Sequence, residues 1–105
     1  MVDENGKPAV RLGVGTNGPC LRMFDENFGT RVELTVDKGK ERSSLSLFDT
    51  NGEPRAMMNV DKDVSRLFVM DENGKTRAFL NVSEKYGPGL DMCDANGKGI
   101  WAAPL

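Results

Sequence analysis

The chain lacks several of the residues from which functional sites are commonly built. Its 105 residues include no histidine, one tryptophan and one tyrosine. The absence of histidine removes both the commonest general base and the commonest zinc ligand. No charge of one sign prevails, because 14 basic and 16 acidic residues leave a formal net charge of −2. A nucleic-acid-binding protein would carry a basic patch or stripe, so no nucleic-acid partner is predicted.

Long hydrophobic runs are also missing. No apolar stretch approaches the roughly 18 residues that a membrane-spanning helix needs, so no membrane segment is predicted in this chain. With 38% hydrophobic and 29% charged residues, the composition is that of a folded protein. Its length predicts a single domain covering residues 1–105.

What the chain does contain is a repeat. The pattern apolar-x-apolar-x-Asp-x-Asn-Gly-Lys-x-Arg-Ala-x-Leu-x-Val returns at intervals of 22, 24, 22 and 23 residues, with its Asp at Asp3, Asp25, Asp49, Asp71 and Asp94. A period of this length predicts one small structural unit copied along the chain. The first unit lacks its first half, which predicts that the sequence belongs to a longer array.

Each unit reads as a β-hairpin. Apolar residues stand two and four places before the Asp and seven, nine and eleven after it, as at Leu45, Leu47, Ala56, Met58 and Val60. Alternation at period two indicates a strand with one apolar face, and Asp-x-Asn-Gly between the strands is turn chemistry. Nine antiparallel strands in a meander are predicted. In the second unit, Asp25 to Gly29, the Gly comes one place later, which predicts a different loop conformation with an unchanged register.

The apolar face of such a meander has to be covered. The predicted fold class is all-β, an antiparallel meander of repeated hairpins that is closed barrel-like or completed by oligomerisation. The sequence leaves barrel, sandwich, propeller and intertwined oligomer open. Cys20 and Cys93 hold unrelated repeat positions in no metal-like spacing, so free thiols are expected instead of a disulfide.

The opposite face carries a second apolar strip. If the residue two before the Asp pairs with the residue seven after it, then Phe24 faces Arg31, and the equivalent pairs are Phe48 with Arg55 and Met70 with Arg77. This register makes Arg31, Arg55 and Arg77 candidate cation–π partners. The strip itself is a candidate self-association surface for a trimer or a dimer, comprising Phe24, Phe48, Met57, Met70 and Phe79. The simpler interpretation is that arginine side chains cover scattered apolar residues.

The motifs carry little chemistry. The Asp-x-Asn-Gly turns invite a calcium interpretation, but the first ligand position of an EF-hand-type loop falls on an apolar residue, such as Leu47. The repeated carboxylates lie at equivalent turns with no aberrant acid beside them, so no catalytic residue, metal ligand or cofactor is predicted. Tyr86 and Trp101 invite a sugar-stacking interpretation, although Trp101 holds an inward repeat position that favours a place in the core.

The string Leu45–Val60 and its recurrence at Leu67–Val82 resemble a repeat found in many uncharacterised bacterial proteins, written LxLxDxNGxxRAxLxV. The resemblance covers essentially the whole chain and brings no known activity. Because such repeats commonly follow a membrane anchor or a coiled coil, it implies a display module at the cell surface or envelope. In the last unit, residues 100–104 replace Arg-Ala-x-Leu, which predicts a capping repeat.

The sequence thus predicts a non-enzymatic structural, assembly or display module that self-associates. The alternative is a lectin-like binding module whose repeated loops recognise a polymeric or surface ligand, either a glycan or a protein. These functions depend on different residues, because assembly needs the outer apolar strip and glycan binding needs loop residues such as Asn51 and Lys75.

Overall fold

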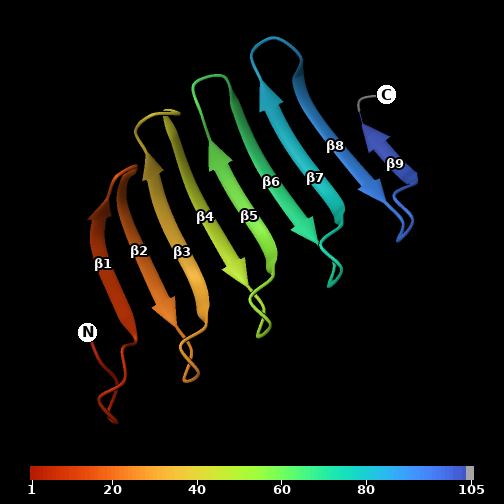
Figure 1. Cartoon of the computed structure of the whole chain (residues 1–105). Helices are drawn as coiled ribbons and strands as arrows, with labels where there is room; N and C mark the ends of the chain where they lie inside the picture. Colours follow the sequence, from red (N-terminus) through yellow and green to blue (C-terminus); the bar gives the residue numbers. More distant parts are fainter. Residues whose placement is uncertain (104–105) are drawn as a thin grey trace.

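In the computed structural model, which describes residues 1–103, the chain forms one antiparallel sheet (Figure 1). Nine strands lie side by side in chain order, so the predicted nine-strand meander is confirmed. The strands are β1 (Val10–Gly15), β2 (Gly18–Phe24), β3 (Thr30–Asp37), β4 (Arg42–Phe48), β5 (Pro54–Val60), β6 (Val64–Met70), β7 (Thr76–Ser83), β8 (Gly87–Cys93) and β9 (Gly99–Ala103). An isolated bridge between Val2 and Pro8 precedes β1. Two predicted positions of the last unit, Pro104 and Leu105, lie outside the described residues.

The repeat turns all lie at one end of the strands, here named the turn end of the sheet, and the connections between hairpins lie at the opposite end (Figure 1). In the fourth unit the Asp71 N–H donates to the Lys75 carbonyl at 2.8 Å, and the Gly74 N–H donates to the Asp71 carbonyl at 3.1 Å. Gly74 has a φ of 80°, in the left-handed region that glycine occupies without steric cost. This is the three-residue hairpin loop that ends in a left-handed residue.

The second unit builds the same turn without a glycine at the left-handed position. Phe28 takes that position with a φ of 65°, and its N–H donates to the Asp25 carbonyl at 3.1 Å. The Asp25 N–H donates to the Gly29 carbonyl at 2.9 Å, as at the equivalent place in the other units. The predicted change of loop conformation was therefore wrong. The hydrogen bonds of the repeat turn impose the left-handed conformation on whichever residue stands fourth.

The predicted register is confirmed on the apolar face. Met23 pairs with Val32, and the same relation joins Leu47 to Ala56 and Val69 to Ala78. The register shifts by one residue just before each turn, so Phe24 pairs with Thr30 and not with Arg31. The prediction that Phe24, Phe48 and Met70 directly face the repeat arginines was wrong. A β-bulge places two residues opposite one, and Arg31, Arg55 and Arg77 are the extra residues.

The sheet is a single open layer with principal extents of 52 × 31 × 18 Å. No hydrophobic side chain of residues 1–103 is buried, and the most buried polar side chains are Ser46 and Asn59, each 8% exposed. Of the predicted ways to cover the apolar face, closure of this chain on itself is not observed. Trp101, expected in a core, is 52% exposed on the edge strand β9.

Candidate functional site

The larger candidate surface is the face on which the repeat places its alternating apolar residues, here named the aliphatic face. Its central row crosses the whole sheet through cross-strand pairs: Leu12, Leu21, Leu34, Leu45, Met58, Leu67, Leu80, Leu90 and Ala103. A second row runs nearer the repeat turns: Val10, Met23, Val32, Leu47, Ala56, Val69, Ala78, Met92 and Trp101. Both rows are apolar at every strand, because the period of two keeps the same face at each repeat.

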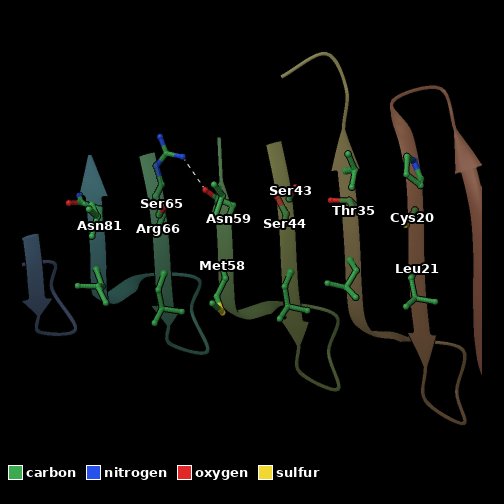
Figure 2. A pocket seen from close by; sticks show the side chains of 18 of the residues that line it. Cys20, Leu21, Thr35, Ser43, Ser44, Met58, Asn59, Ser65, Arg66 and Asn81 are labelled. Carbon is green, nitrogen blue, oxygen red and sulfur yellow. Dashed lines mark hydrogen bonds between the residues drawn. The ribbon is translucent and has the colours of Figure 1, made fainter. Parts of the chain in front are cut away.

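The aliphatic face is open to solvent. Thirteen of its large apolar side chains are between 41% and 78% exposed, with Leu80 and Met92 at the low end and Leu12 at the high end. A hollow of about 670 Å³ crosses the middle of the sheet and is lined by Leu21, Leu45 and Met58 among others (Figure 2). Single exposed apolar residues are ordinary on proteins, whereas a contiguous patch of this extent marks an interaction surface.

The opposite face, here named the mixed face, carries the predicted self-association residues. Phe24, Phe48, Met57, Met70 and Phe79 all lie on it and are half-buried by their neighbours. Sequence reasoning missed Phe68, which lies between Met57 and Phe79 in the cross-strand pairing and stacks on the Phe79 ring with a centroid distance of 4.7 Å. The register that was predicted for the hairpins already places Phe68 opposite Phe79, so the signal was present in the sequence.

At the turn end of the sheet, the side chain of each repeat Asp accepts hydrogen bonds from the backbone of its own turn. One carboxylate oxygen of Asp71, Oδ1, accepts the backbone N–H groups of Asn73 and Lys75 at 2.9 and 3.0 Å. These hydrogen bonds to the charged form, that of Lys75 foremost, lower the pKa of Asp71, and the corresponding bond from Glu53 lowers the pKa of Asp49. The Asp is therefore explained by the conformation of the turn and needs no ligand.

The bulged arginines join neighbouring hairpins. The Nε–H of Arg77 donates to the Cys93 carbonyl at 2.7 Å, and its Nη1 lies 3.5 Å from the second oxygen of Asp71. Arg55 repeats this arrangement one hairpin earlier and Arg31 two hairpins earlier, with the carbonyls of Met70 and Phe48 at 3.0 and 2.8 Å. Each guanidinium thus connects the turn of its own hairpin to the strand end of the next. The ring-to-cation contacts found in residues 1–103 belong instead to Lys7 with Phe28 and Lys85 with Tyr86.

One polar cluster is not repeated, and sequence reasoning missed it. Nη1 of Arg66 donates to Asp61 at 2.9 Å and to Asn59 at 3.0 Å, and Nη2 of Arg42 lies 3.6 Å from the same Asp61 oxygen (Figure 2 shows the Arg66–Asn59 bond). The hydrogen bond from Arg66, followed by those from the Asp63 and Val64 N–H groups, lowers the pKa of Asp61 to about 2. Both carboxylate oxygens of Asp61 accept donors from this chain, Oδ1 from the Asp63 and Val64 N–H groups and Oδ2 from Arg66. Because Arg42, Asn59 and Arg66 come from β4, β5 and β6, the cluster joins these three strands.

The remaining chemical interpretations find no assembled site. Within residues 1–103, no group of three or more acidic or cysteine side chains is placed to hold a metal ion. Tyr86, 78% exposed, lies in the connection between β7 and β8, at the end of the strands opposite the repeat turns. Trp101 pairs with Met92 near the turn end of the sheet, so the structure does not bring the two aromatic residues together. The thiols of Cys20 and Cys93 are free, as predicted.

No protein-family model matches the chain, and no curated protein matches it. In the part of the chain that the structure describes, no helix has the length and apolar character needed to cross a membrane.

Proposed function

We propose that this chain is a non-enzymatic structural module of β-hairpin repeats that assembles with copies of itself. The observation that carries the proposal is the open sheet. Every strand contributes a residue to each of its two apolar rows, and no hydrophobic side chain within residues 1–103 is buried. A folded domain of 11.5 kDa is expected to expose about 5,800 Å² of surface. The chain exposes 7653 Å² of surface. This is about 1,850 Å² more than a domain that folds without a partner is expected to expose.

This excess is of the size that stable association removes. A standard protein–protein interface covers about 800 Å² on each partner, and obligate homodimers cover more. Burial of apolar surface contributes about 25 cal/mol per Å², which makes an uncovered face of this kind costly for a small protein. The repeat turns, with their Asp and Arg side chains, stand at the rim and keep the edge of such an assembly hydrated.

The test is the solution mass of the full chain, measured by light scattering over a wide range of protein concentration. A stable dimer or trimer supports the proposal. A folded monomer at all concentrations would contradict it and would favour the binding-module alternative. A glycan screen would then follow, with substitutions at Asn51 and Lys75, which stand exposed in the repeat turns.

A further inference from the structure

We infer that the interface is the aliphatic face, and that its occupant is the aliphatic face of another copy of this chain. The inference rests on the proposed self-assembly and names the surface that performs it. It differs from the expectation drawn from the sequence, in which the strip of Phe24, Phe48, Met57, Met70 and Phe79 mediates association.

The burial of the two faces distinguishes them. On the mixed face, the five strip residues are already half-buried within a single chain. On the aliphatic face, half-buried and exposed residues alternate along the central row. Leu45 and Leu67 are half-buried. Leu34, Met58 and Leu80 are 43%, 52% and 41% exposed although they lie in the interior of the sheet. Side chains on the same face of a strand pack against their cross-strand neighbours, and this packing leaves their outer ends uncovered. Those outer ends need a second layer, and two sheets pack face to face about 10 Å apart.

The charge distribution selects a copy of the chain over a charged partner. The residues that the period of two places on the aliphatic face between Val10 and Ala103 are apolar except for Ser43 and Ser65, and none carries a charge. The charged side chains stand on the mixed face and in the connections, as Arg22 with Glu33 and Arg66 with Asp61 do. Two copies therefore meet without like-charge repulsion, with a dry centre and a charged rim, which is the usual anatomy of a homomeric interface.

The geometry of the repeat also favours a copy. Each row crosses nine strands with the same spacing, so a second sheet presents ridges at the same interval. The central row is almost all leucine, with Met58 in the middle strand, and contains no aromatic residue that would project beyond its neighbours. Facing sheets with side chains of similar length can interdigitate over their whole width, as the two layers of a sandwich do.

The experiment is thiol labelling of two neighbouring serine variants in the assembled protein. Ser43 is exposed on the aliphatic face, where it pairs with Val36 and Val60, and Ser44 is half-buried on the mixed face, where it pairs with Thr35 and Asn59. Ser43→Cys and Ser44→Cys are labelled with iodoacetamide, and the modified peptides are quantified by mass spectrometry. Cys20 and Cys93, both on the mixed face, serve as internal references in each sample.

In a single chain, Ser43→Cys reacts faster than Ser44→Cys because it is more exposed. We expect assembly to reverse this order and to slow Ser43→Cys about tenfold or more, since the centre of an interface excludes water as a protein interior does. Cys20, Cys93 and Ser44→Cys should keep their rates over every protein concentration at which circular dichroism shows the sheet to be folded. Ser65→Cys on β6, also exposed on the aliphatic face, repeats the measurement if the first variant does not fold.

The outcomes separate the two proposals. An oligomer in which Ser43→Cys is open while Cys20, Cys93 and Ser44→Cys are protected would overturn this inference, leave self-assembly standing and return the interface to the mixed face. An oligomer with both faces open would overturn the inference as well and would point to pairing between edge strands. A monomer with no protected thiol would overturn both the inference and the proposed function.

Discussion

Phe28 shows at the scale of one residue how strongly the repeat turn constrains the backbone. Its φ of 65° matches the 77° to 84° of the glycines that hold the same position in the other four turns. A side chain in the left-handed region costs about 1–2 kcal/mol because Cβ approaches the following carbonyl oxygen. The ring lies under Lys7 Nζ at 5.8 Å, a contact worth about 0.5–1 kcal/mol at an exposed site. The ring contact therefore offsets only part of the backbone cost.

We expect Phe28→Gly to be more stable than Phe28→Ala by about 1 kcal/mol, since both variants lose the ring and only glycine removes the strain. Chemical denaturation at one fixed protein concentration measures the difference. Gly74→Ala is the matched control, because a Cβ at Gly74 meets no atom within 4 Å and tests the backbone alone. It should lose about the same amount. Equal stability of the two Phe28 variants would show that the turn accepts a side chain without strain.

At the scale of the element, the strands and the pairing of their apolar residues follow closely from the sequence, while the bulges beside the repeat turns do not. The period of two and the Asn-Gly turns predict the strands and the pairing of Leu47 with Ala56, because both depend on residues close together in the chain. The bulge at Arg31 escaped prediction, since the turn alone decides how many residues oppose Phe24. The repeat predicts which residues share the apolar face, but the alternation of residues along a strand does not determine what covers that face.

The cluster around Asp61 escaped for a different reason. It occurs once, so no repetition marks it, and its members come from three strands: Asn59 on β5, Arg66 on β6 and Arg42 on β4. In sequence, Arg42 reads as a solvated loop residue. In the structure it opens β4, opposite Asp37, and points a nitrogen toward Asp61. The contacts depend on the register between hairpins, which no local motif reveals.

The lowered pKa of Asp61 predicts that the stability of the folded chain depends on acid. The pKa of Asp61 is lowered from 3.8 to about 2 in the folded chain, so the unfolded chain takes up the proton first as the pH falls. The stabilisation by Asp61 is complete above about pH 4 and is lost as the pH drops toward 2. We expect wild type to lose more stability than Asp61→Asn between these two pH values, as measured by urea denaturation at each pH. Asp63→Asn is the control, because Asp63 contributes its backbone N–H to the cluster; an acid response of Asp61→Asn that equals that of wild type would exclude this role.

At the scale of the whole molecule, the absence of a hydrophobic core from residues 1–103 changes what stability means. Neighbouring strands contact each other and more distant strands do not, so a single chain is a linear array of hairpins. Such an array gains its cooperativity from nearest-neighbour interfaces, which here include the hydrogen bonds that Arg31, Arg55 and Arg77 make to the next hairpin. Covering the aliphatic face adds a contact that every hairpin shares at once.

The thermal midpoint should therefore depend on protein concentration. If folding and assembly are one reaction, mass action adds about 1.4 kcal/mol per dimer for each tenfold increase in concentration. For a dimer of about 200 residues this corresponds to a rise of about 3–5 °C in Tm per tenfold step.

Circular dichroism melts over a hundredfold range of protein concentration measure the shift in Tm. A variant with glutamate at the centre of the aliphatic face, Leu45→Glu, provides the comparison. We expect this variant either to be unfolded at all concentrations or to melt at a lower Tm that no longer rises with concentration, because the charge cannot enter a dry interface. A wild-type Tm that stays constant over this range would mean that the single sheet is stable without a partner, and that its exposed leucines cost less than their area predicts.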